Sequence, residues 1–325
     1  MLLFLADPHI GIHKSNENFY NTMISLFEEI VDVCSLRGID KIAVLGDFFE
    51  NRRVISQKSM ATAQKVIKIC RDIRLILIRG NHDTYYQDSA DPNWLTSLGN
   101  HDNVTTVEHE PLFLGDYCFV PWGYDVTKIQ WDKYLFGHFA ISTFLMNDGF
   151  ACPNGSKPSD YSKFKHVFSG HFHWPSSRNN ITYVGSPFQH NFGDCGSPRG
   201  YYILDGENVT FTEFTSAPKF YKINTDAFDS EKQQIPGNFI KLIFDKDYGT
   251  AKNTKFVEEA ERLSPLSIVV DTSKLSKYSE IQTDELVHFD DAEEMFIDFL
   301  NRQDIPEHLN KELLVKITHK LWQEE

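Results

Sequence analysis

Over roughly the first 200 residues, short continuous apolar runs alternate with longer segments of helical periodicity. Residues 2–6, 42–45 and 75–78 are apolar runs with the length of buried strands. Between them, two segments place apolar side chains at helical spacing: Phe19, Met23, Phe27, Ile30 and Cys34, then Met60, Ala63, Ile67 and Cys70. Gly38 is placed to end the first helix. This alternation of strands and helices predicts an α/β layered fold.

The apolar pattern continues to about residue 215 and then changes. Six further strands are expected, the last three as an antiparallel finish to the sheet: 117–120, 134–136, 167–168, 182–184, 201–204 and 209–214. Beyond them, a strand, an apolar-striped helix and a strand form a compact β-α-β unit: 239–244, 251–263 and 267–270. We therefore predict a larger α/β domain at 1–215 and a small α/β domain at 216–280.

The C-terminal segment, 281–325, is predicted to form two amphipathic helices separated at Ile305-Pro306. The second helix has an apolar face made of Leu313, Leu314, Ile317, Leu321 and Trp322. The two helices could simply pack on each other. We favour binding of this face to a partner groove, because the apolar surface is large for so short a hairpin.

Composition limits the class of protein. A chain of 325 residues with 41% hydrophobic residues and 26 Phe has the composition of a globular protein. Its apolar runs are too short to cross a bilayer, and its N-terminus lacks the features of a signal peptide. The five Cys include no CxxC pair, which indicates free thiols in a reducing compartment. We expect a cytoplasmic protein with no membrane association.

The formal net charge of −14 does not favour nucleic acid as a partner, because phosphate binding requires Lys and Arg. This objection weakens if the acidic residues lie away from the site and bound cations supply positive charge. Acidic residues are frequent near the C-terminus: Asp284, Glu285, Asp290, Asp291, Glu293 and Glu294. Net charge alone therefore leaves the substrate open.

Five short polar motifs each follow a predicted strand. They are Asp7-Pro8-His9, Gly46-Asp47, Gly80-Asn81-His82-Asp83, Gly137-His138 and Gly170-His171-Phe172-His173. Ligands in α/β sheets bind outside the carboxyl ends of strands, so these side chains are expected to converge on one edge. A Gly before four of the motifs lets the backbone turn sharply toward the common centre.

The motifs deliver carboxylates, one amide oxygen and several imidazoles. The predicted metal ligands are Asp7, His9, Asp47, Asn81, His138, His171 and His173. This donor set suits manganese, iron or zinc better than calcium or magnesium. Two divalent cations would leave positive charge after pairing with the two carboxylates, and that charge suits a hydroxide and a phosphate. Each motif alone could be an ordinary turn or a solvated His, but their conjunction at strand ends favours a two-metal phosphoesterase.

This series of motifs resembles the calcineurin-like metallophosphoesterase superfamily, and more closely the SbcD-type DNA-repair nucleases, which include bacteriophage recombination endonuclease subunits. The narrower likeness rests on Asp47-Phe48-Phe49-Glu50 followed by Arg52, on Tyr183-Val184-Gly185-Ser186-Pro187 and Gly193, and on Pro198-Arg199-Gly200-Tyr201. It covers about residues 1–205. Beyond them only the layout is similar, with a small capping domain at 216–280 and a helical pair at 281–325.

The resemblance implies how the ligands would be divided. Asp7, His9 and His173 would hold one metal ion, Asn81, His138 and His171 the other, and Asp47 would bridge the two ions. The ions are expected to be Mn²⁺, with Mg²⁺, iron or zinc as alternatives.

The resemblance also implies roles for residues beside the metals. His82 would be the general acid or a transition-state stabiliser, because an imidazole can exchange a proton near neutral pH. Asp83 could orient His82, or could serve in an ordinary turn or cap. At Glu50 the sequence departs from its relatives, which often carry a His thought to act near the scissile phosphate. A carboxylate there would repel DNA unless it is protonated or linked to a metal.

The resemblance identifies the chain as a manganese-dependent DNA exonuclease or endonuclease subunit acting in repair and recombination. Arg52 and Arg199 are the expected DNA contacts. The expected partners are DNA, an SbcC-type coiled-coil ATPase bound by the C-terminal helices, and a second copy of the chain contacted through 16–38 and 56–72. For a bacteriophage protein the location would be the host cytoplasm. Two alternatives remain: a phosphomonoesterase or protein phosphatase with the same site, and a DNA-end-binding scaffold with weak catalysis.

Overall fold

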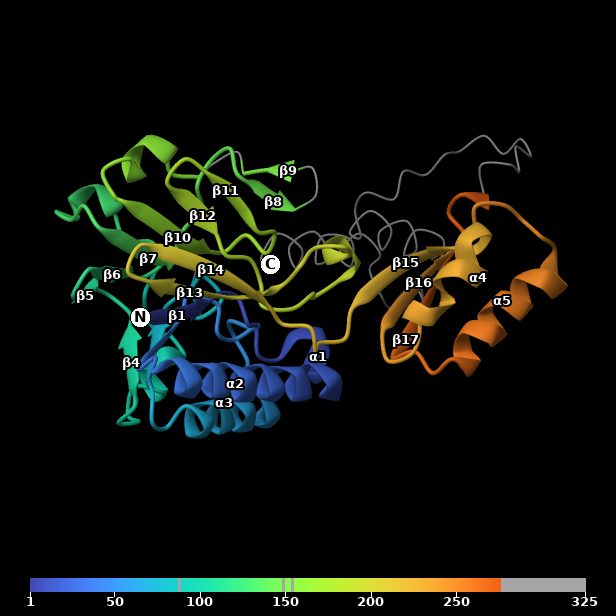
Figure 1. Ribbon diagram of the computed structural model, residues 1–325, viewed down its shortest axis with the longest axis horizontal. Coiled ribbons are helices and arrows are strands. Elements are labelled where there is room, and N and C mark those ends of the chain that lie inside the picture. Colours follow the sequence, from blue (N-terminus) through green and yellow to red (C-terminus); the bar gives the residue numbers. More distant parts are fainter. Residues whose placement is uncertain (87–88, 148–149, 153–154, 276–325) are drawn as a thin grey trace, which may run out of the picture. The chain divides into compact units, whose positions relative to one another are not determined.

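The structure is a computed structural model that describes residues 1–275, except 87–88, 148–149 and 153–154 (Figure 1). The predicted C-terminal helices lie outside the described residues, together with Leu313, Leu314, Ile317, Leu321 and Trp322. Two six-stranded sheets make up most of the chain to residue 213, and a three-stranded sheet follows. The α/β layered fold expected from the sequence is confirmed.

The first sheet has the strand order β14-β13-β1-β2-β3-β4. Four of its strands run parallel: β1 (Leu2–Leu5), β2 (Lys41–Val44), β3 (Arg74–Ile78) and β4 (Val104–Val107). The antiparallel strands are β13 (Gly200–Asp205) and β14 (Asn208–Glu213). The antiparallel finish that was predicted for 201–204 and 209–214 is therefore confirmed.

The second sheet has the order β11-β12-β10-β7-β6-β5. Its strands are β5 (Leu112–Leu114), β6 (Tyr117–Val120), β7 (Tyr134–His138), β10 (His166–Gly170), β11 (Ser176–Arg178) and β12 (Ile181–Tyr183). The placement predicted for 182–184 was wrong, because β12 pairs in parallel with β10 in this second sheet. A separate pair, β8 (Leu145–Asn147) and β9 (Phe150–Ala151), completes this region.

Side-chain alternation along β1 joins the layers. Leu3 and Leu5 face one core, which also contains apolar residues of α2 and α3, while Leu2 and Phe4 face a second core between the sheets. The ring of Phe4 lies 5.2 Å from that of Phe136 in the second sheet, centroid to centroid. Burying one such side chain contributes about 1.5–3 kcal/mol, so this face holds the two sheets together.

Helices α2 (Glu17–Arg37) and α3 (Gln57–Ile69) cover the outer face of the first sheet (Figure 1). The short helix α1 (Ile12–Ser15) precedes them. Both predicted helices are confirmed, and Gly38 ends α2 with a φ of 66° while its N–H donates to the carbonyl of Cys34. Ser56 caps the start of α3 by accepting a hydrogen bond from the N–H of Ser59.

The predicted β-α-β unit beyond residue 215 is also present and contains one strand more than expected. Its parallel strands are β15 (Phe220–Asn224), β16 (Phe239–Ile243) and β17 (Ser267–Asp271), and its helices are α4 (Phe228–Glu231) and α5 (Thr250–Arg262). Ile223, Ile240, Leu242 and Ala260 form its small core. Strand β15 was missed because its polar and apolar residues give no continuous run.

Two further expectations concern the whole chain. Among the described residues, no helix has both the length and the apolar character needed to cross a membrane. All five Cys lie in the described part of the chain and are free thiols.

Candidate metal centre

All seven predicted ligands converge where the carboxyl ends of strands from both sheets meet. Asp7 and His9 follow β1, Asp47 follows β2, and Asn81 follows β3. His138 is the last residue of β7, and His171 and His173 follow β10. The expectation of a single sheet edge was therefore too simple, because three motifs come from the first sheet and two from the second.

One group of ligands, the His9 group, consists of Asp7, His9 and His173. Its ligand atoms all lie within 4.8 Å of one another. The Nε2 atoms of His9 and His173 are 3.0 Å apart, so both imidazoles point at one place. The buried Asp7 carboxylate is held by the N–H of His171, which donates to both of its oxygens at 3.0 and 3.1 Å.

The second group, the His138 group, consists of Asp47, Asn81, His138 and His171. Oδ1 of Asn81 lies 2.9 Å from Nε2 of His138 and 2.9 Å from Nδ1 of His171. Oδ2 of Asp47 lies 3.3 Å from Nε2 of His138 and 3.7 Å from Nε2 of His9. Asp47 therefore faces both groups.

The loops that deliver these side chains have an unusual backbone. Asp7, His9, Asp47 and His171 have φ angles of 52°, 49°, 50° and 88°, in the left-handed region that side chains other than Gly seldom adopt. Such conformations cost on the order of 1–3 kcal/mol each, and they cluster at functional sites. The concentration of four of them on predicted ligands marks this region independently of the motifs.

The glycines of the motifs serve two different purposes. Gly46 has a φ of 89°, which allows the sharp turn that was predicted. Gly80 instead allows close approach, because a Cβ atom there would lie 2.2 Å from both the N and Oδ1 of Asp47. The loops after β2 and β3 can touch only because position 80 has no side chain.

Three imidazoles of the site are oriented by contacts at Nδ1. Nδ1 of His138 donates to the carbonyl of Leu45 at 2.8 Å, and Nδ1 of His82 donates to the carbonyl of Glu50 at 2.6 Å. Nδ1 of His9 lies 2.6 Å from Oε2 of Glu50. With Nδ1 engaged in this way, Nε2 of His9 and of His138 is left to face the centre.

Burial and the histidines shift the acidic groups of the site in opposite directions. Burial raises the pKa of Asp7 to about 6. Burial also acts to raise the pKa of Asp47, but the nearby His138, His9 and His82 outweigh it and hold that pKa below its usual range. Asp47 is therefore ionised.

The histidines divide in the same way. Burial acts to lower the pKa of His9 and of His138, but Glu50 and Asp47 raise the former to about 9, and Asp47 raises the latter to about 9. Burial lowers the pKa of His171 to about 3 and places that of His173 well below its ordinary value. His9 and His138 thus hold protons at neutral pH until a cation displaces them.

The residues fit divalent cations. Asp7 and Asp47 are at most 2% exposed, and among the described residues the only cationic groups within ion-pairing distance of them are histidines. Carboxylates, an amide oxygen and imidazoles with converging nitrogens are the donors that transition metals prefer. Bound cations would supply the positive charge that these buried carboxylates need.

His82 lies beside the ligands, half-buried, with its ring centroid 5.0 Å from that of His9. Asp83 does not orient this ring. Its carboxylate accepts hydrogen bonds from the N–H of Gly80 at 2.8 Å and of Phe49 at 3.2 Å. Burial and the nearby Asp47 raise the pKa of Asp83 to about 7. Of the two roles predicted for Asp83, the structural one matches its contacts.

Arg199 is buried and does not offer its guanidinium to a surface phosphate. Nη2 donates to Oδ1 of Asp194 at 2.7 Å, and Nη1 donates to Oγ of Ser186 at 2.8 Å and to the carbonyl of His173. The predicted DNA contact is therefore not supported by its position, because Arg199 instead holds the loop that carries His173. Arg52 is half-buried, on the loop that carries Glu50.

One residue of the site was missed from the sequence. His190 is 1% exposed, and its ring centroid lies 5.5 Å from that of His9 and 5.1 Å from that of His173. Neither of its ring nitrogens has a hydrogen-bond partner among the described residues. The one available signal was its position three residues after the Tyr183–Pro187 segment on which the family resemblance rests.

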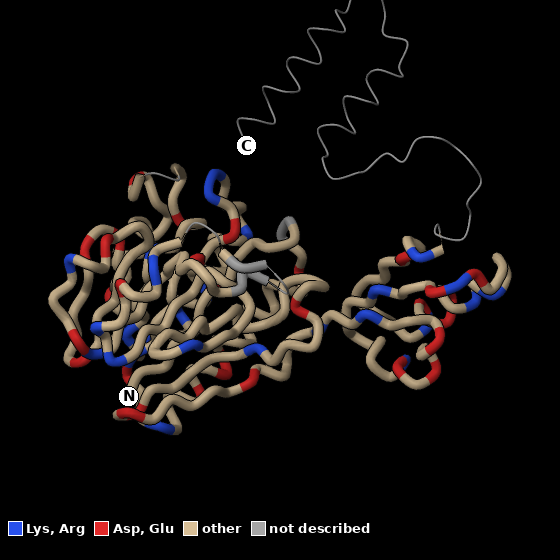
Figure 2. The backbone as a smooth tube through the Cα atoms, turned by 90° about the horizontal axis from the view of Figure 1, so that it is seen from above, with Lys and Arg blue, Asp and Glu red and all other residues tan. Residues whose placement is uncertain are grey.

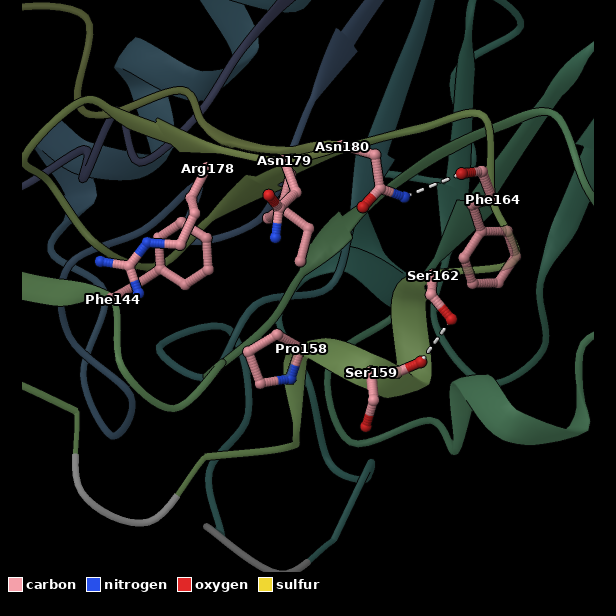
Figure 3. Close-up of a pocket in the computed structure, with 9 residues that line it drawn as sticks. Phe144, Pro158, Ser159, Ser162, Phe164, Arg178, Asn179 and Asn180 are labelled. Carbon is pink, nitrogen blue, oxygen red and sulfur yellow. Dashed lines mark hydrogen bonds between the residues drawn. The ribbon is translucent and has the colours of Figure 1, made fainter.

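The largest cavities do not contain the ligand set. A cavity of about 450 Å³ is lined by Phe144, Pro158, Ser159, Ser162, Phe164, Arg178, Asn179, Asn180 and Ile181 (Figure 3). A second, of about 310 Å³, reaches His138 beside Trp122. The ring of Trp122 lies 4.9 Å from that of His171, so this aromatic residue borders the His138 group.

The fold and the donor set define a metal-dependent phosphoesterase. The chain belongs to the calcineurin-like phosphoesterase family, whose profile matches residues 1–194. The resemblance predicted from the motifs is thus confirmed at the level of the superfamily.

Individual relatives extend beyond that domain. The chain is 25% identical over 346 aligned positions to "Exonuclease subunit 1" of Enterobacteria phage T4, covering 99% of this chain and 98% of the relative. It is 20% identical to the SbcD component of the SbcCD nuclease of Staphylococcus saprophyticus, covering 65% and 67%, and 25% identical to that of Staphylococcus epidermidis, covering 67% and 69%. A solved structure, the Pseudomonas putida nuclease MPE, is 18% identical over 67% of this chain and 78% of its own, with a TM-score of 0.33. The curated relatives confirm the narrower likeness to SbcD-type nucleases.

Proposed function

We propose that this chain is a two-metal DNA nuclease that hydrolyses phosphodiester bonds with Mn²⁺ as its natural cation. The observation that carries the proposal is the position of Asp47, whose Oδ2 lies 3.3 Å from Nε2 of His138 and 3.7 Å from Nε2 of His9. A carboxylate between two sets of converging donors is the arrangement that two adjacent cations require.

The His9 group would hold one cation and the rest of the His138 group the other, with Asp47 shared. When bound, the two cations supply Lewis acidity and an activated water for in-line attack on phosphorus. Each ligand's own task is to stay oriented. Leu45 and Glu50 do this for His138 and His9 through contacts at Nδ1.

His82 is the proposed proton donor to the leaving oxygen. Its Nδ1–H is engaged by the carbonyl of Glu50, so Nε2 is the atom that can carry a proton to substrate. The N–H of His82 also donates to Oδ1 of Asp47 at 2.8 Å, which ties the position of the imidazole to the shared carboxylate. Proton donation therefore stays aligned with the metals.

DNA is the proposed substrate because the curated relatives are named as nuclease or exonuclease subunits. Two local features are suited to it. Tyr85 and Tyr86 follow the His82 motif, are 42% and 56% exposed, and present rings on which bases can stack. Lys and Arg lie interspersed with Asp and Glu along the described chain, so a metal-filled centre would be a strong local positive charge (Figure 2). Arg52 remains the proposed phosphate contact.

The proposed partner is an SbcC-type ATPase, as the names of two relatives imply for those proteins. The C-terminal segment, with Leu313, Leu314, Ile317, Leu321 and Trp322, is the proposed binding element. A homodimer through the exposed faces of α2 and α3 is part of the same proposal.

A phosphomonoesterase with the same site is the second candidate, since the metal chemistry does not itself distinguish monoesters from diesters. Manganese-dependent hydrolysis of an end-labelled linear duplex, compared between the native chain and His82→Ala, tests the first candidate. We expect label release by the native chain only. Release from p-nitrophenyl phosphate but from neither DNA nor bis(p-nitrophenyl) phosphate, even with the ATPase present, would contradict the nuclease proposal.

A further inference from the structure

Glu50 is held against the first motif by its backbone. The loop after β2 runs beside the loop after β1, with the N–H of His9 donating to the carbonyl of Asp47 at 3.1 Å. The N–H of Ile10 donates to the carbonyl of Phe48 at 2.9 Å, and the N–H of Glu50 donates back to that of Ile10 at 3.2 Å. This short ladder fixes where the Glu50 side chain begins relative to His9.

The two ends of Glu50 contact two different histidines of the site. Its Oε2 lies 2.6 Å from Nδ1 of His9, a side chain that is 2% exposed. Its carbonyl oxygen accepts a hydrogen bond from Nδ1 of His82 at 2.6 Å. The Glu50 side chain itself is 37% exposed, so it borders solvent while its carboxylate turns inward.

We propose that Glu50 is a positioning residue that holds His9 for metal binding through its carboxylate and His82 for proton donation through its carbonyl. This inference rests on the proposed function, because it takes His9 to be a metal ligand. The carboxylate does not act as a repulsive charge toward DNA, because its charge is directed at the His9 imidazole.

The physical reason lies in the ring itself. An imidazole whose Nδ1–H is held by a carboxylate is locked in one tautomer and one orientation, and its Nε2 becomes a stronger donor. Nε2 of His9 is the atom that lies 3.0 Å from Nε2 of His173. Loss of the carboxylate would free the ring to rotate and weaken the donor at the same time.

The side chain and the backbone of Glu50 should be separable by mutation. Substitution removes the carboxylate from His9 but keeps the carbonyl that engages His82. Glu50→Ala should therefore affect metal binding at the His9 group and leave the placement of His82 intact. Glu50→Gln retains an oxygen that can accept from Nδ1–H, so it should restore part of the lost affinity.

The experiment is calorimetric titration of the full chain with Mn²⁺, without DNA. We expect Glu50→Ala to weaken one of the two binding events by about 10–100-fold, with Glu50→Gln between it and the native chain. Glu261→Ala, which removes an exposed glutamate of α5, is the matched control and should bind as the native chain does. Circular dichroism of each variant verifies folding, and Glu50→Gln decides the question if Glu50→Ala does not fold.

The outcomes separate this inference from the proposed function. Unchanged Mn²⁺ affinity in both Glu50 variants, with tighter binding of duplex DNA, would overturn the inference and show that the carboxylate faces DNA. Loss of both binding events together would also overturn it, because only the His9 group is in contact with Glu50. A native chain that binds no divalent cation would overturn the proposed function itself.

Discussion

The two halves of the metal centre are built from the same kinds of ligand but are supported differently. In the His9 group, the imidazole of His9 is backed by a carboxylate, with Oε2 of Glu50 at 2.6 Å from Nδ1. In the His138 group, the imidazole of His138 is backed by a neutral carbonyl, that of Leu45, at 2.8 Å. One half is therefore stabilised by a charged side chain that can be removed by mutation, and the other by backbone that cannot.

This difference has a consequence for how the halves can vary. Backbone support at His138 is fixed by the geometry of the strands, since Leu45 directly follows β2 and His138 ends β7. Support at His9 depends on which residue occupies position 50. The His9 half is thus the one whose metal affinity can be tuned by sequence without changing a ligand.

Removing the carboxylate common to both halves is expected to have the largest effect. Asp47→Asn weakens the only carboxylate that faces both His9 and His138 among the described residues, so both Mn²⁺ binding events should weaken. Hydrolysis of labelled duplex should fall by a factor on the order of 10⁴, as when a central member of a cooperative site is lost. Initial rates and calorimetry measure the two effects, and Asp132→Asn, at an exposed residue, is the control. Retention of both cations would rule out a shared ligand.

His82 separates catalysis from ligation, because it lies beside the His9 group without belonging to it. His82→Ala should lower the hydrolysis rate by about 10²–10⁴-fold, the usual contribution of a general acid. Both Mn²⁺ affinities should remain near those of the native chain. His101→Ala, at an exposed imidazole, is the control. A variant that loses a cation instead of rate would make His82 a ligand.

Arg199 tests the support of the His9 half from its other side, through the loop of His173. Arg199→Met leaves the buried carboxylate of Asp194 without its partner, so the free energy of unfolding should fall by about 3–5 kcal/mol. Urea titration measures this change, with Arg178→Met, an exposed arginine, as the control. Unchanged stability together with weaker DNA binding would return Arg199 to the role predicted from the sequence.

The dependence of metal affinity on pH should also distinguish the halves. One proton must leave His9 in the first half and His138 in the second, and both have a raised pKa of about 9. Affinity should therefore rise about tenfold per pH unit up to about 9 in each half. Below about 6, protonation of Asp7, whose pKa is about 6, should make the first half fall more steeply. Calorimetry in buffers of different ionisation enthalpy counts the protons released, and equal slopes below 6 would contradict this account.

The smallest effect is expected outside both halves, at Arg52. If it contacts a DNA phosphate, Arg52→Ala should weaken binding equally for different sequences and reduce the salt slope by about 1. Fluorescence anisotropy at several salt concentrations measures this, with Arg262→Ala on α5 as the control. An unchanged slope would remove Arg52 from the DNA-contacting surface.

The sequence was most informative where function depends on local spacing. Five motifs at strand ends predicted all the ligands that converge, because a ligand's position follows from the strand that precedes it. The division into two sheets was not predictable in this way. Strand β12 looks like its neighbours in sequence, and only its pairing with β10 shows which sheet it joins.

Residues that act through contacts between distant segments were harder to assign. Glu50 was expected to repel DNA, whereas its carboxylate lies against His9. Asp83 and Arg199 have charges that suggested catalysis and DNA binding, yet both are buried and hold loops in place. Such roles depend on the direction of one side chain across a long sequence separation, which periodicity and motif spacing do not encode.

The most direct test of the two-metal account is anomalous X-ray scattering from crystals of this chain grown with Mn²⁺. The account predicts two manganese peaks about 3.5–4 Å apart with Asp47 between them. One peak should contact His9 and His173, and the other should contact Asn81, His138 and His171. A single peak, or a peak held by Glu50 and His82 instead, would contradict it.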